Sequence, residues 1–176
     1  MREFFPFIFI AILIIACNPN NTEVTTPSKS QNSNPVIDTI PRVTGIGGVF
    51  FKSKNPQEVK DWYGNNLGIA IGPYGSPFEF RNAHRPEEIN YLNWDPFPDT
   101  TSYFDPSEKE FMINYRVQNI EGLVRKLKKN GVTIVDDITA VEYGKFVHIM
   151  DLEGNKIELW EPIDSFLTKL GGATTK

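Results

Sequence analysis

Two side chains that can exchange protons, His148 and Glu158, lie ten residues apart near the end of the chain. Both belong to segments that alternate like β-strands, and the intervening Leu152-Glu153-Gly154 predicts a tight turn with Gly154 in the left-handed conformation. This register places His148 across from Glu158 on one face of the hairpin. A carboxylate orients a histidine ring and stabilises its charged form, so the pair could supply a general base. The alternative is a pair that only satisfies two half-buried polar groups.

Strand alternation predicts which other side chains share the face of Glu158. The two strands of the hairpin contribute Phe146, Met150, Lys156 and Trp160, and two earlier strands contribute Phe50, Lys52, Met112, Asn114 and Arg116. The side chains expected to contact a ligand are Phe50, Met112, Asn114, Arg116, Phe146, Trp160 and Trp94. Arg116 and Lys52 could bind an anionic group or could extend to solvent.

The elements that carry these residues belong to a unit that occurs twice. Each copy begins with an apolar strand, Val43–Ser53 or Phe111–Val117. An asparagine follows, Asn55 or Asn119, which predicts the N-cap of a helix. The spacing from strand to cap is the same in both copies.

Each copy ends with a predicted hairpin and a tryptophan, an acidic residue and a proline. The hairpins are Phe78–Asn82 with Glu88–Trp94, and Phe146–Met150 with Asn155–Trp160. Trp94-Asp95-Pro96 aligns with Trp160-Glu161-Pro162. The sequence therefore predicts two tandem βαβββ modules of an α+β fold, at about residues 43–97 and 110–162.

The N-terminal segment, residues 1–16, has the features of a secretory signal, because its apolar stretch is too short to cross a bilayer. It is followed by Cys17, the only cysteine, and Ile14-Ile15-Ala16-Cys17 resembles a bacterial lipobox. We expect a protein that is lipidated at Cys17 and thereby anchored in the bacterial cell envelope. The alternative is an ordinary signal peptide with a chance cysteine.

The rest of the chain divides into three parts. Residues 17–41 are rich in Asn, Thr, Ser and Pro and predict a flexible tether. Residues 42–163 form the predicted domain, and residues 164–176 a C-terminal tail. The net charge of −4 and the absence of a long basic run give no footprint for nucleic acid.

The repeated motifs resemble the vicinal oxygen chelate superfamily, which includes glyoxalase I, bleomycin-resistance proteins and extradiol dioxygenases. The matching segments are Gly45–Phe51 with Trp62-Tyr63 and Leu67-Gly68, Phe111–Val117, and Asp151–Trp160. The resemblance implies two paired, curled sheets with helices outside and a cavity inside. It also implies a possible homodimer, and it gives His148 a position that resembles that of an acid/base tyrosine in extradiol dioxygenases.

Members of this superfamily that bind a metal carry ligands at four strand positions. The resemblance places these positions on Gly48, Leu92, Met112 and Glu158, and a small alignment shift replaces Leu92 by Ile89. Only Glu158 is a suitable ligand, because glycine and leucine have no donor atom and a thioether suits soft metals. We therefore expect no cofactor and no standard metal site, and a divalent metal is disfavoured.

Three functions remain open at this point. The first is a metal-independent domain that binds a small apolar or aromatic molecule at the envelope. The second is a glyoxalase-like lyase or isomerase, with or without a weakly bound divalent metal, in which Glu158 and His148 transfer protons. The third is a structural envelope protein that uses the duplicated fold only as an interaction surface.

Overall fold

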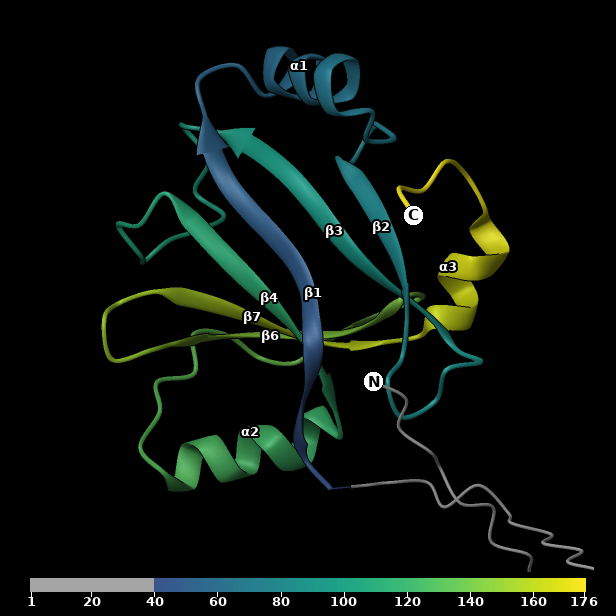
Figure 1. The fold of residues 1–176 in the computed structure, drawn as a ribbon. Coiled ribbons are helices and arrows are strands. Elements are labelled where there is room, and N and C mark those ends of the chain that lie inside the picture. The colour runs from purple at the N-terminus through teal and green to yellow at the C-terminus, as the bar shows by residue number, and fades with distance from the viewer. Residues whose placement is uncertain (1–39) are drawn as a thin grey trace, which may run out of the picture. The chain divides into compact units, whose positions relative to one another are not determined.

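The computed structural model of the chain describes residues 40–176, which form a seven-stranded sheet and three helices (Figure 1). The strands are β1 (Arg42–Ser53), β2 (Ser76–Arg81), β3 (Ile89–Pro98), β4 (Phe111–Gln118), β5 (Thr139–Val141), β6 (Gly144–Met150) and β7 (Lys156–Pro162). The helices are α1 (Pro56–Leu67), α2 (Ile120–Lys129) and α3 (Asp164–Leu170). The predicted signal segment, Cys17 and most of the predicted tether lie outside the described residues.

The sheet, in the order β2-β3-β1-β4-β7-β6-β5, joins two modules through their first strands. β1 and β4 pair antiparallel, and each pairs in parallel with the last strand of its own module, β3 or β7. Phe50 and Asn114 are equivalent positions, because each lies five residues before the N-cap of its helix. The register opposes Phe50 to Met112 and Gly48 to Asn114, so an approximate twofold axis relates the modules. The duplicated α+β architecture predicted from the sequence is confirmed.

The first module has one strand fewer than predicted. An isolated bridge between Gly72 and Gly75 stands between α1 and β2, where the second module has the short strand β5. Gly75 has a φ of 85°, and a Cβ atom there would lie 2.1 Å from the carbonyl oxygen of Trp94. This close approach needs glycine and leaves no room for side chains that alternate along a strand.

The two longer helices, α1 and α2, begin where the asparagine caps predict. In α1 the Asn55 Oδ1 atom accepts a hydrogen bond from the Glu58 backbone N–H at 3.2 Å. In α2 the Asn119 Oδ1 atom accepts one from the Gly122 N–H at 3.0 Å. Each bond satisfies a backbone donor that the first turn of a helix leaves without a partner. Within residues 40–176, no helix combines the length and the apolar composition that a bilayer span requires.

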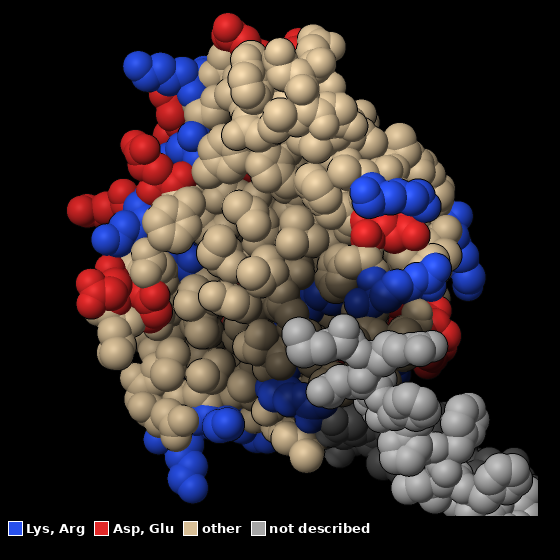
Figure 2. Space-filling model, in the orientation of Figure 1, with Lys and Arg blue, Asp and Glu red and all other residues tan. Residues whose placement is uncertain are grey.

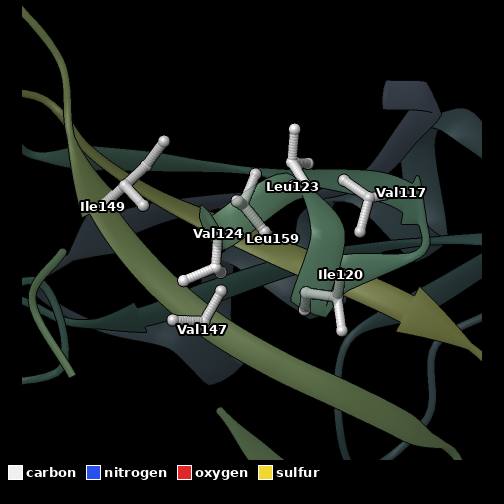
Figure 3. Close-up of a cluster of buried hydrophobic side chains, with 7 residues drawn as sticks. All are labelled: Val117, Ile120, Leu123, Val124, Val147, Ile149 and Leu159. Carbon is white, nitrogen blue, oxygen red and sulfur yellow. The ribbon is translucent and has the colours of Figure 1, made fainter. Parts of the chain in front are cut away.

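The main apolar core lies between α2 and the outer face of the second module (Figure 3). Its buried members are Val117, Ile120, Leu123, Val124, Val147, Ile149 and Leu159. The β7 side chains Ile157 and Leu159 alternate with Glu158 and pack against the core beneath α2, so Glu158 points to the opposite, inner face.

Leu159 is 3% exposed and Ile157 packs against the same cluster.

Trp94 lies on the outer face as well, so the prediction that it lines the cavity is wrong. Its ring packs against Tyr63 of α1 and Phe51 of β1, with centroids 4.7 and 5.5 Å apart. The error comes from aligning Trp94 with Trp160. The strand pairing opposes Phe50 to Asp95 and Asn114 to Glu158, so Asp95 is the true equivalent of Glu158. By the same count, the equivalent of Trp160 is the inward-facing Phe97.

The last thirteen residues, which the sequence pattern leaves as a tail, have regular structure. Helix α3 packs beside β3 (Figure 1). Beyond it, the Thr175 carbonyl accepts a hydrogen bond from the Glu79 N–H at 2.9 Å, and the Thr175 N–H donates to the Pro77 carbonyl at 2.8 Å. The C-terminal segment therefore extends the edge of the sheet at β2. Its short length and few apolar residues gave no periodicity from which to predict this.

Candidate functional site

The inner face of the sheet carries a polar cluster centred on Glu158, a residue only 3% exposed. Its carboxylate accepts hydrogen bonds from three side chains: the Tyr103 hydroxyl, the Asn114 amide and the His148 ring. The distance from Glu158 Oε1 to His148 Nε2 is 3.1 Å. A buried carboxylate needs such donors, since burial without them costs several kcal/mol (of the order of 2–7 even for a neutral polar group).

His148 lies directly opposite Glu158 in the β6–β7 ladder, which confirms the predicted register. Its other ring nitrogen, Nδ1, lies 2.6 Å from the Asp136 carboxylate, which also accepts the His148 backbone N–H at 2.7 Å. Both ring nitrogens therefore face carboxylate oxygens, an arrangement that stabilises the charged imidazolium. Burial acts to lower the pKa of His148, but the bonds to Glu158 and Asp136 outweigh it and raise the pKa. The geometry thus favours Glu158 rather than His148 as a proton acceptor.

Tyr103 belongs to the connection between the modules, residues 99–110, which folds over the inner face. Its hydroxyl donates to Glu158, its carbonyl accepts from Lys156 Nζ at 2.7 Å, and its ring stacks on Phe97 at 5.5 Å. Burial of the hydroxyl, together with the charge of Glu158, raises the pKa of Tyr103. Tyr103 is 40% exposed, so it lies between the buried Glu158 and the solvent.

Phe104, the next residue, is fully buried against two predicted ligand contacts, Phe50 and Met112. These two side chains face inward as predicted, but Phe104 fills the space beside them. A second bond fixes the connection, because the Ser107 hydroxyl donates to the Gly154 carbonyl at 2.6 Å. This end of the inner face is therefore packed apolar core. The side chains that could act on a ligand begin at the polar cluster around Glu158.

The opposite end of the inner face is built around Arg116, which is 3% exposed. Its guanidinium donates to the Tyr91 carbonyl at 2.9 Å and to the Asp164 carboxylate at 2.5 Å. It lies 5.1 Å from the ring of Trp160, within the range of a cation–π contact. Trp160 in turn stacks on Phe146 at 5.8 Å, nearly parallel at 8°. A cavity of about 700 Å³, whose lining includes Arg116 and Asp164, opens at this end.

The structure therefore brings together Asn114, Arg116, His148, Glu158, Phe146 and Trp160, all of which the sequence predicts as site residues. Sequence reasoning missed Tyr103, Asp136 and Asp164. Each lies in a segment without strand or helix periodicity, or at the start of a helix too short to show it, so no pattern pointed to them.

The four positions that would hold a divalent metal do not form a donor set. Gly48 has no side-chain donor, and the Met112 thioether is buried between apolar rings. Asp95, the position that the structure substitutes for Leu92, lies 2.9 Å from Lys60 Nζ, so an ammonium group already neutralises it. Glu158 already accepts three hydrogen bonds. Within residues 40–176, no three His, Cys, Asp or Glu side chains are arranged to hold a metal ion.

No family model and no curated protein sequence matches the chain. Solved structures do match it. A variant of methylmalonyl-CoA epimerase from Streptomyces coelicolor, in complex with 2-nitronate-propionyl-CoA, has a TM-score of 0.53 at 10% identity over 69% of this chain and 96% of its own. A second variant of that enzyme has a TM-score of 0.51 at 11% identity over 69% and 99%.

A glyoxalase/bleomycin resistance protein/dioxygenase superfamily member from Vibrio splendidus 12B01 has a TM-score of 0.42 at 13% identity, over 69% of this chain and 98% of its own. At these identities the likeness concerns the fold alone, and of these three structures the two epimerase variants have a TM-score above 0.5. The chain has the fold of the vicinal oxygen chelate superfamily, as its repeated motifs predict.

Proposed function

We propose that the domain binds a small organic molecule on the inner face of its sheet without the help of a divalent metal. The observation that carries this proposal is a row of four polar side chains, each more than nine-tenths buried: Asn114, Arg116, His148 and Glu158. Burial of polar and charged groups costs free energy that an apolar core of the same shape would not. Their presence on one face is therefore better explained by a ligand than by the needs of the fold.

The surrounding side chains favour a ligand with an apolar or aromatic part. Phe146 and Trp160 form a stacked pair beside Arg116, and the Phe80 ring lies 5.9 Å from the guanidinium. Such mixed lining, with few polar groups among aromatic walls, is typical of small-molecule sites. The epimerase structures with a similar fold hold a CoA ester, which supports a small-molecule partner for this fold.

A ligand screen by thermal melting, followed by titration calorimetry, tests this function. We expect a compound that raises the melting temperature of the full-length protein to bind at least tenfold more weakly to Glu158→Ala and to Asn114→Ala. His84→Ala is the matched control, because His84 is exposed in the loop between β2 and β3. Equal binding by all four proteins would place the ligand elsewhere and refute the inner-face site.

A second candidate function is proton transfer, and the chain of contacts Tyr103–Glu158–His148–Asp136 favours it. If a substrate displaced Tyr103, Glu158 would face the substrate's C–H bond and could accept its proton. The neighbouring imidazolium of His148 would stabilise the carboxylate until that proton is taken up. This is the chemistry of an isomerase or lyase.

Exchange of the α-proton of methylmalonyl-CoA in D₂O, followed by NMR, tests the second function. We expect exchange by the wild type and none above the buffer rate by the double variant Glu158→Gln, His148→Ala. Exchange at the wild-type rate in the double variant rules out these two residues. No exchange by any of the proteins leaves the binding function as the better account.

We also propose that the domain is tethered to the cell envelope through a lipid on Cys17. The sequence motif alone supports this, because Cys17 lies outside the described residues. Metabolic labelling with an alkyne analogue of palmitate should label the wild-type chain and leave Cys17→Ser unlabelled. Equal labelling of both chains contradicts the proposal.

A further inference from the structure

We infer that Arg116 is a carboxylate-binding residue of the inner-face site, and that Asp164 of α3 occupies the place of the ligand's carboxylate. The inference deepens the proposed small-molecule function and rests on it. Asp164 of the C-terminal helix would then compete with the ligand's carboxylate for Arg116.

The surroundings of Arg116 suit a planar anion. The guanidinium lies over two aromatic rings, 5.1 Å from that of Trp160 and 5.9 Å from that of Phe80. The Tyr91 carbonyl accepts from one terminal nitrogen, which fixes the orientation of the group and leaves the other terminal nitrogen for an anion. That nitrogen, Nη2, is the one that Asp164 contacts at 2.5 Å. A fixed guanidinium recognises carboxylates with a geometry that lysine cannot provide.

Asp164 uses this place only in part. Its Oδ2 atom accepts from both Arg116 and Asn90, the latter at 3.2 Å, whereas its Oδ1 atom is buried and has no hydrogen-bond partner. A buried oxygen without a partner costs about 1–3 kcal/mol. Burial raises the pKa of Asp164 even though the charge of Arg116 acts to lower it. A ligand carboxylate that satisfied both of its oxygens would therefore replace Asp164 without leaving Arg116 unpaired.

Helix α3 itself is held by few contacts. It has seven residues, none of them buried, and its N-cap residue Ile163 makes no side-chain cap bond. A helix of this length is not stable by itself and depends on tertiary contacts. Besides Asp164, the described contacts include a bond of 3.2 Å from the Tyr91 hydroxyl to Thr168 and a ring contact between Phe166 and Tyr143.

The cavity of about 700 Å³ provides the room for the rest of the ligand. Arg116 and Asp164 both line it, together with Thr168 of the same helix. Its volume falls in the range of sites that accept small molecules. The ligand class that fits beside Arg116 is a small molecule with a carboxylate group.

Calorimetric titration of the full-length protein with benzoate tests the inference. Asp164→Asn should bind benzoate at least tenfold more tightly than the wild type, because the competing charge is removed. Benzamide, which has the same shape without the charge, should gain nothing. The matched control is Asp137→Asn, which removes one negative charge from an exposed site and should bind benzoate as the wild type does.

The double variant Asp164→Asn, Arg116→Gln should lose the gain completely. A second single variant, Thr168→Val, removes the bond to Tyr91 and leaves the ion pair in place, and it should bind benzoate two- to fivefold more tightly than the wild type. The inference is overturned if neither single variant gains affinity for benzoate, or if the double variant keeps the gain.

Failure of this inference can be told apart from failure of the proposed function. A neutral ligand that loses affinity in Glu158→Ala and Asn114→Ala, but not in Arg116→Gln, keeps the inner-face site and removes the carboxylate from it. If no ligand depends on Glu158 or Asn114, the proposed function itself fails.

Discussion

At the scale of single residues, Glu158 shows how the fold accommodates a buried charge. Three donors from three parts of the chain converge on it: Tyr103 from the connection between modules, Asn114 from β4 and His148 from β6. Two of the donors are also held elsewhere, His148 by its bond to Asp136 and Tyr103 by stacking on Phe97. The carboxylate is therefore held in one orientation before any ligand arrives, which is the preorganisation that binding and catalysis both require.

Replacing Glu158 by glutamine keeps its shape but removes its charge. One of the three donors must then face an amide N–H, so a buried group loses its partner. We expect the free energy of unfolding to fall by about 1–3 kcal/mol, measured by urea denaturation. The exposed control His84→Ala should change it by less than about 0.5 kcal/mol. A Glu158→Gln protein as stable as the wild type would contradict the hydrogen-bond network described here.

The stability that His148 contributes should depend on pH. Its folded pKa lies above the ordinary value of 6.5, so this contribution is complete below pH 6.5 and is lost as the pH rises through the folded pKa. We therefore expect the stability gap between the wild type and His148→Gln to be largest at about pH 5.5 and to shrink toward about pH 9. Thermal melts in a series of buffers measure the gap. A gap that grows with pH would mean that the ring is neutral.

At the scale of elements, most strands and the two longer helices could be predicted, whereas the connection and the C-terminal helix α3 could not. Alternation in β6 and β7 and the left-handed Gly154, with a φ of 76°, were enough to oppose His148 to Glu158. The asparagine caps were enough to start both long helices. Residues 99–110 have neither alternation nor helical spacing, so nothing indicated that Tyr103 and Phe104 would reach the inner face. Trp94 was misplaced because matching tryptophans outweighed the strand count.

The buried ring of Phe104 holds that connection in place, and Phe104→Ala tests its role. Removal of a fully buried phenylalanine typically lowers the free energy of unfolding by about 3–5 kcal/mol. We expect a loss in this range. We also expect faster hydrogen exchange of the backbone amides around Tyr103. Tyr74→Ala is the control, because Tyr74 is an exposed aromatic residue. Equal stability of the two variants would mean that Phe104 does not anchor the connection.

At the scale of the whole domain, charge is unevenly distributed over the surface. Figure 2 shows a broad face without charged side chains, over β1 and β4, with charges gathered at its margins. Large apolar side chains are exposed on these two strands: Val43 and Ile46 on β1, and Phe111 on β4. Exposed apolar surface of this kind favours association. The homodimer that the resemblance implies stays a prediction, and this face is where we expect the second chain.

A charge at the centre of that face should prevent association. We expect light scattering to give a dimer mass for the wild type and a monomer mass for Ile46→Lys. The control Ile163→Lys changes another exposed isoleucine, away from the two strands, and should remain dimeric. A monomeric wild type would contradict the predicted dimer without affecting the inner-face site.

The pairing of β1 with β4 also has a consequence for the order of folding. It opposes Phe50 to Met112, which are 62 residues apart along the chain, whereas the β6–β7 hairpin closes over a short turn. Distant pairings form slowly, because the entropy of closing a long loop must be overcome before the contacts stabilise it. We expect each hairpin to appear early and the two halves to join late. Asn114 and His148 both lie in the second module with Glu158, so these contacts of the polar cluster can form before the two halves join.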